Sequence, residues 1–114
     1  MADNFYELDQ FVGLQLDQDW SDDFADPYAA AEEGISRRSD EQLRQIHGEI
    51  TRFLNGVAAI EERLIYFDLN GAFPGRGNAF DVWLQAVRRR IEQALAGIHS
   101  EPLEAPPGYY GNSR

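Results

Sequence analysis

The segment SDEQLRQIHGEITRFLNG, residues 39–56, contains the clearest helical pattern in the sequence. Ser39 and Gln42 have the spacing of a capping box, in which each side chain binds the backbone N–H of the other residue. Apolar residues then recur every three or four positions, as they do along the buried face of an α-helix. These residues are Leu43, Ile46, Ile50, Phe53 and Leu54. Asn55 and Gly56 are typical of a helix end. The segment therefore predicts an amphipathic helix that packs against further apolar surface.

A first helix is predicted at the start of the chain. Asp3 or Asn4 can cap it, and Glu7 lies three residues after Asn4, in capping-box register. Its apolar stripe consists of Phe5, Leu8, Phe11, Val12 and Leu14.

A second, short helix follows an acidic segment. Asp26 as the N-cap with Pro27 at the first helical position is a strong start. This helix is expected to run to about Ile35, with Gly34 weakening its end.

Two further helices follow residues 39–56. One is predicted over residues 58–69, followed by a glycine-rich loop at 70–78. Asn78 then caps the last helix, whose apolar residues are Phe80, Trp83, Leu84, Val87, Ile91, Leu95 and Ile98. No segment alternates with the period of a strand. We expect an all-α fold, a single compact bundle of about five helices over residues 1–99, with a flexible Pro/Gly-rich tail at 100–114.

The charge of the chain is concentrated in its first third. There are 20 acidic residues and 10 arginines, yet residues 1–33 contain ten acids and no base. The net charge of -10 therefore belongs to that part. It repels nucleic acid and anionic membranes and attracts a cationic partner. The N-terminus lacks the apolar segment of a secretory signal, and no apolar run is long enough to span a membrane. We expect a cytoplasmic protein.

The acidic segment LDQDWSDDFAD, residues 16–26, has three possible roles: a cation site, a surface for a basic partner, or a solvated loop. An EF-hand counted from Asp17 would need Gly where Asp22 stands and Glu where Tyr28 stands. The match of DDFAD to a magnesium-binding motif is too short to carry a site. There is no cysteine, and His47 and His99 occupy ordinary helix positions. We expect no metal, no cofactor, no small-molecule substrate and no enzymatic activity.

The two tryptophans require separate interpretations. Trp83 belongs to the apolar stripe of the last helix and is expected in the core. Trp20 lies among aspartates, so it either closes one end of the bundle or serves as an aromatic anchor in an interface. Burial is favoured, because a large apolar ring is more often buried than displayed.

The stretch LDQFVGLQLDQDW, residues 8–20, resembles a signature of all-helical immunity proteins from bacterial contact-dependent growth inhibition systems. The matching residues are Gln10, Phe11, Gly13, Gln18, Asp19 and Trp20. Other matches are the helix opening with DP, the Glu49-Ile50 pair and the WL of the last helix, so the resemblance covers residues 4–96. The chain departs from the pattern at residues 15–17, where an aromatic–aromatic–His run is common, and at FDLNG, where a Gly and tyrosines are usual.

The resemblance implies a protein that binds and neutralises the toxic C-terminal domain of a cell-surface effector, often a nuclease. A nuclease active site is basic, so an acidic surface could occupy it. The expected contacts are Asp17, Asp22 and Asp23, with Tyr28, Glu32 and Glu33 as neighbours if the second helix shares their face. The expected structural residues are Phe11, Gly13, Asp19, Trp20 and Trp83. Two alternatives stay open: some acids only solvate a loop, or the chain is an acidic adaptor for a basic protein that is not a toxin.

Overall fold

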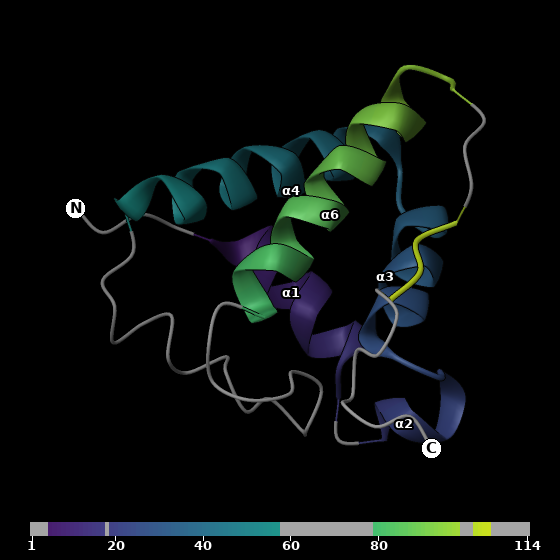
Figure 1. The fold of residues 1–114 in the computed structure, drawn as a ribbon. Helices are drawn as coiled ribbons and strands as arrows, with labels where there is room; N and C mark the ends of the chain where they lie inside the picture. Colours follow the sequence, from purple (N-terminus) through teal and green to yellow (C-terminus); the bar gives the residue numbers. More distant parts are fainter. Residues whose placement is uncertain (1–4, 18, 58–78, 99–101, 106–114) are drawn as a thin grey trace.

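The structure is a computed structural model, and it describes residues 5–17, 19–57, 79–98 and 102–105 (Figure 1). Its elements are α1 (Tyr6–Gln15), α2 (Trp20–Asp23), α3 (Pro27–Ser36), α4 (Asp40–Arg52), the π-helical turn η1 (Phe53–Val57) and α6 (Ala79–Leu95). No strand occurs in these ranges, and the predicted all-α fold is confirmed. The predicted helix at 58–69, the loop at 70–78 and the cap Asn78 lie outside the described residues.

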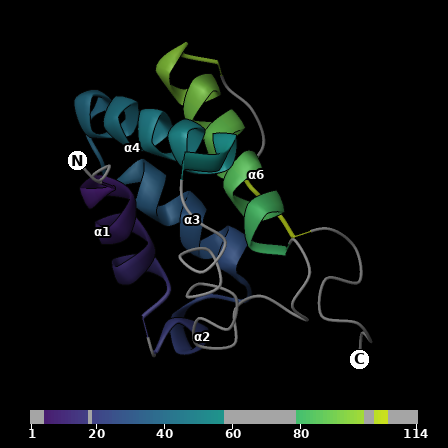
Figure 2. The same ribbon diagram turned by 90° about the vertical axis from the view of Figure 1, so that its left-hand side faces the viewer.

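Helices α4 and α6 form the centre of the fold (Figures 1 and 2). Helix α1 packs on α4, and α3 packs on both α1 and α6, while the short α2 lies at one end of the molecule beside α3. The buried residues of α6 are Phe80, Trp83, Leu84, Val87 and Ile91. Ile98, predicted to continue this stripe, is 55% exposed because α6 ends at Leu95.

The start of α4 is as predicted, but its end is different. The Gln42 backbone N–H donates to Ser39 Oγ over 3.2 Å, and the Ser39 N–H donates to Gln42 Oε1 over 3.1 Å, which completes the capping box. The α-helix does not continue to Asn55 and Gly56 but changes into the π-helical turn η1 at Phe53. This turn keeps the Phe53 ring buried, edge-on to the Phe80 ring.

Helix α1 corrects two predictions. The predicted caps Asp3 and Asn4 lie outside the described residues, and the N-cap position is occupied by Phe5, which makes no side-chain cap. Leu14, predicted to point inward, is 62% exposed. The buried face instead ends with Gln15, which donates a 2.9 Å hydrogen bond to the backbone oxygen of Ala30 and so joins α1 to α3.

The start of α3 follows the sequence closely, whereas Gly34 has a role that was not predicted. Asp26 Oδ1 accepts the backbone N–H groups of Tyr28 and Ala29 at 2.8 and 2.9 Å. The helix ends at Ser36, close to the predicted end at about Ile35. A Cβ at Gly34 would lie 2.7 Å from the Gln15 side chain, so glycine is what lets α3 approach α1.

Both tryptophans are buried, as predicted. Trp83 is completely buried, and its indole N–H donates a 3.0 Å hydrogen bond to the backbone oxygen of Pro27. Trp20 is 5% exposed at the start of α2 and belongs to the hydrophobic core. Trp20 therefore closes one end of the helical core, and it does so from within the acidic segment.

Residues 102–105 lie in the segment predicted to be a flexible tail. The Leu103 backbone N–H donates to Glu32 Oε1 over 3.0 Å, and the Leu103 side chain is half-buried against the core. Glu32 also forms a bidentate ion pair with Arg90 of α6. These contacts attach this part of the C-terminal segment to α3 and α6. In the described part of the chain, no helix is long and apolar enough to cross a membrane.

Candidate partner-binding surface

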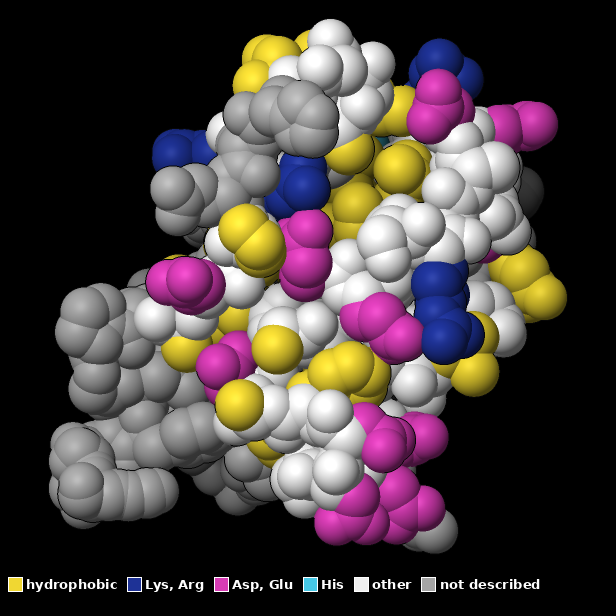
Figure 3. All heavy atoms as spheres, turned by 90° about the vertical axis from the view of Figure 1, so that its right-hand side faces the viewer, with side chains coloured by type: hydrophobic (Ala, Val, Ile, Leu, Met, Phe, Trp, Pro, Cys, Tyr) yellow, Lys and Arg dark blue, Asp and Glu magenta, His cyan; other side chains and the backbone are white. Residues whose placement is uncertain are grey.

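The turn from α1 into α2 displays four aspartates to solvent. Helix α1 ends at Gln15, and the Asp17 carboxylate accepts the Asp19 backbone N–H at 2.9 Å, which shapes the turn. The buried Trp20 then fixes the start of α2, so that the other side of this short helix faces water. The four exposed residues are Asp17, Asp19, Asp22 and Asp23, which we call the α2 acidic surface. Figure 3 shows acidic side chains gathered at this end of the molecule.

The α2 acidic surface is not neutralised by the part of the fold that the structure describes. Neither Asp22 nor Asp23 takes part in an ion pair with another described residue. The exposed carboxylates repel one another, and their field extends about 8 Å into solvent at physiological ionic strength. The energetic cost of this repulsion is reduced by binding a cationic surface. The arrangement is therefore suited to attracting a basic partner.

Tyr28 and Asp26 do not belong to this exposed surface. Tyr28 is only 2% exposed, and its side chain belongs to the core. Burial, and secondarily the charge of Asp26, raises the pKa of Tyr28 above its ordinary value. Asp26 uses its carboxylate to cap α3. Tyr28 therefore contributes to the core and Asp26 to the start of α3, rather than to the exposed surface.

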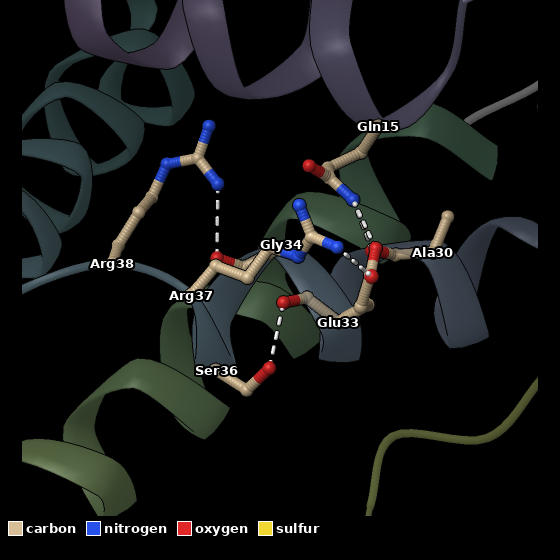
Figure 4. Close-up of polar contacts among 7 residues, drawn as sticks. All are labelled: Gln15, Ala30, Glu33, Gly34, Ser36, Arg37 and Arg38. Carbon is tan, nitrogen blue, oxygen red and sulfur yellow. Dashed lines mark hydrogen bonds and ion pairs between the residues drawn. The ribbon is translucent and has the colours of Figure 1, made fainter.

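Glu32 and Glu33 point to different sides of α3. Glu32 binds Arg90 and Leu103, away from α2. Glu33 pairs with Arg37 at 2.9 Å and accepts a longer hydrogen bond, 3.5 Å, from the Gln15 side chain (Figure 4). Of the two, only Glu33 lies near the α2 acidic surface, because it lines the same groove as Asp23.

A groove of about 580 Å³ separates the end of α1 from α2 and the end of α3. Its lining residues are Leu14, Gln15, Asp23, Phe24, Glu33, Arg37 and Arg38. The Arg38 guanidinium lies over the Phe11 ring, 5.0 Å from its centroid, and donates to the Gly34 backbone oxygen (Figure 4). Burial lowers the pKa of Arg38 from its ordinary value, although arginine stays charged at neutral pH. The sequence analysis assigned no role to this groove, because only tertiary packing brings its three walls together.

No group of three or more His, Asp or Glu side chains in the described ranges is arranged to hold a metal ion. The exposed aspartates of this end of the molecule are bordered by the apolar residues Leu14 and Phe24 of the groove.

A family model described as CdiI immunity protein matches residues 4–91, a range that includes α1 to α4 and most of α6. The chain belongs to the CdiI immunity protein family. Comparison with curated proteins and with solved structures found no match. Membership implies that this immunity protein neutralises the toxin of a contact-dependent growth inhibition system. The family predicted from the QDW stretch is confirmed, with a matched range that ends at residue 91 rather than 96.

The signature residues of this immunity protein divide between core and surface. Phe11, Trp20 and Trp83 are buried, and the rings of Phe11 and Trp83 lie 6.1 Å apart between centroids. Gly13 and Asp19 are exposed. The buried members belong to the core between α1, α2 and α6, and the exposed members face solvent.

Proposed function

We propose that this immunity protein inhibits a nuclease toxin by binding alone, placing the α2 acidic surface over the basic active site of the toxin. The observation that carries the proposal is the exposure of four aspartates on one short, anchored turn without a basic partner among the described residues. A nuclease active site holds phosphates with cationic groups, so carboxylates can occupy the same positions. The proposed place of action is the cytoplasm, where such a toxin meets nucleic acid.

The acidic residues of this surface differ in whether their carboxylates already make contacts within the fold. Among the described residues, the Asp22 and Asp23 carboxylates form no hydrogen bond or ion pair, so they are the proposed principal contacts. Asp17 also shapes the turn through the Asp19 N–H, so it has a structural and a proposed binding role. Glu33 extends the charge toward the groove. The buried Tyr28 and the ion-paired Glu32, which the sequence grouped with them, are left out of the proposed contact surface.

The rate of association supports this arrangement on physical grounds. A toxin must be captured before it turns over many substrates. Complementary charges can raise the association rate constant to about 10⁸ M⁻¹s⁻¹ or more at low salt, against about 10⁵–10⁶ for uncharged surfaces. Because Trp20 fixes α2, the carboxylates are held in place before the partner arrives, which reduces the entropy lost on binding.

The test is calorimetric titration with the toxin domain encoded beside this protein, at low and high salt. We expect tight binding that weakens with salt and is weaker in Asp22→Asn/Asp23→Asn. Asp40→Asn/Glu41→Gln is the matched control, because it removes the same charge from exposed positions at the start of α4. Equal weakening by both pairs would show that only net charge matters. Tight binding unaffected by the α2 pair would move the interface elsewhere, and absence of binding by the wild-type protein would refute the proposed function.

A further inference from the structure

The outer face of α1 ends in an exposed leucine next to an exposed glycine. Gln10, Gly13 and Leu14 are all exposed, and their three- and four-residue spacings place them on one side of the helix. Leu14 is 62% exposed, more than the other exposed large hydrophobic residues Tyr6, Val82 and Ile98. A single exposed leucine is common on protein surfaces and indicates little alone. Its neighbour Gly13 supplies a second observation.

Nothing in the described fold requires glycine at position 13. Glycine is less favourable than alanine inside a helix, since it loses more backbone freedom on folding. Such a glycine is usually explained by a positive φ or by close packing, as at Gly34. Gly13 has neither: its φ is not positive, and a Cβ built there meets no described atom within 4 Å. The missing side chain instead leaves the backbone of α1 open to close approach from outside.

Gly13 and Leu14 are continuous with the groove and with the acidic surface. Leu14 lines the groove, whose opposite wall includes Phe24 and Asp23. Phe24 is half-buried at the end of α2, so part of its ring surface remains accessible. Asp17 lies two residues after the last residue of α1, at the same end of the helix. Figure 3 shows apolar side chains next to the acidic ones on this face. An apolar centre with a charged rim is the usual anatomy of a protein–protein interface.

We propose that Gly13, Leu14 and Phe24 form an apolar docking site for a segment of the toxin that carries an apolar side chain beside a lysine or arginine. The apolar side chain enters the groove against Leu14 and Phe24, and the toxin backbone approaches α1 at Gly13. The neighbouring cation meets Asp17 and Asp23. The inference rests on the proposed function and deepens it, because it assigns a partner segment to the edge of the α2 acidic surface.

The negative charge of the chain favours a basic toxin segment at this site over a second copy of the chain. Two copies joined here would bring their acidic surfaces together, and each chain carries a net charge of -10. A second groove, between α1 and α4, also has an exposed aromatic residue, Tyr6, and a helical glycine, Gly48. Two arginines line each groove, so the arginines do not distinguish them. The groove at the end of α1 is the one whose wall includes Asp23 of the α2 acidic surface, and its Arg37 is paired with Glu33, so it suits a basic segment better.

The experiment measures binding kinetics of Leu14→Asn and Gly13→Ala with the toxin domain encoded beside the gene. We expect Leu14→Asn to weaken binding by about tenfold, mainly through faster dissociation, at low and high salt alike. This pattern distinguishes Leu14→Asn from replacement of the aspartates, which should slow association and have a smaller effect at high salt. Val82→Asn, an exposed apolar residue on α6, is the control and should bind as the wild type does.

Gly13→Ala gives the sharper test, because folding and binding should change in opposite directions. The added methyl group has room in the free protein, so the urea midpoint should rise, while toxin binding weakens by at least about threefold. Gly48→Ala also has an open Cβ position on a helix and should raise the midpoint without changing binding.

The outcomes separate the two proposals. In one outcome, Asp22→Asn/Asp23→Asn weakens toxin binding, whereas Leu14→Asn and Gly13→Ala leave it unchanged. That result would overturn the docking site and keep the proposed function. The docking site would also be overturned if Val82→Asn weakened toxin binding as much as Leu14→Asn does, or if Gly48→Ala weakened it as much as Gly13→Ala does. No wild-type binding would overturn both.

Discussion

Glu49, a residue of α4, caps the start of α1, and its replacement tests how these two helices are joined. The first N–H groups of a helix have no partner within the helix. Phe5, at the N-cap position of α1, has no side-chain oxygen to offer. Glu49 of α4 supplies one: its Oε1 accepts the Leu8 backbone N–H over 2.7 Å, and the residue is only 7% exposed. One buried carboxylate therefore caps α1 and joins it to α4.

The size of the effect follows from this geometry. A hydrogen bond to a charged group contributes about 1.5–3 kcal/mol, so Glu49→Ala should lower the free energy of unfolding by about 2–3 kcal/mol. Glu49→Gln keeps an acceptor oxygen but loses the charge that favours the positive end of the α1 dipole, and about 1 kcal/mol should be lost. Both variants should still fold, because a domain of this size is typically stable by about 5–15 kcal/mol.

Urea unfolding followed by far-ultraviolet circular dichroism measures both changes. With a slope of about 1–3 kcal/mol per M, a loss of 2 kcal/mol lowers the midpoint by about 1 M. Glu104→Gln, at an exposed position outside the helices, is the control and should change stability by less than about 0.5 kcal/mol. A Glu49→Ala midpoint equal to that of Glu104→Gln would refute the capping role. A Glu49→Gln variant as unstable as Glu49→Ala would show that the charge, rather than the acceptor oxygen, provides the stabilisation.

Three further predictions concern the packing of α3. Gly34→Ala should destabilise the protein by about 1–3 kcal/mol in urea unfolding, because the new Cβ would lie 2.7 Å from Gln15. Burial raises the pKa of Tyr28 above its usual 10.0, so its contribution to stability is complete below about pH 10 and is lost as the pH rises through the folded-state pKa. Urea midpoints at about pH 8 and pH 11 should reveal this loss, and Tyr28→Phe should remove that component. Glu32→Ala should speed hydrogen exchange at the Leu103 amide, and unchanged exchange would contradict the attachment of residues 102–105.

The local parts of the fold could be predicted because a few neighbouring residues determine them. The capping box of Ser39 and Gln42 and the cap formed by Asp26 need only residues three positions apart, so the sequence alone contains the information. The cap of α1 could not be found in this way. Its carboxylate, Glu49, is 41 residues from the Leu8 N–H in the chain, and only the packing of α4 on α1 brings them together.

The candidate site shows the same division. The exposure of Asp17, Asp22 and Asp23 follows from residue type, since unpaired carboxylates are rarely buried. Tyr28 and Glu32 are predicted as neighbours of these aspartates on the condition that the second helix shares their face. The rotation of α3 places Tyr28 in the core and directs Glu32 toward α6, which no local pattern reveals.

The separation of core and surface around Trp20 has a consequence for recognition. The indole of Trp20 is buried and holds α2, whereas Asp22 and Asp23, two and three residues later, make no ion pair with the described residues. Replacing these aspartates removes repulsion in the free protein, so it should leave the fold intact while altering the affinity for a basic partner. A short helix fixed by one aromatic ring can therefore present different charges on the same scaffold. We therefore propose that, in this immunity protein, the Trp20 ring stabilises α2 while the aspartates that follow it determine the affinity for the partner.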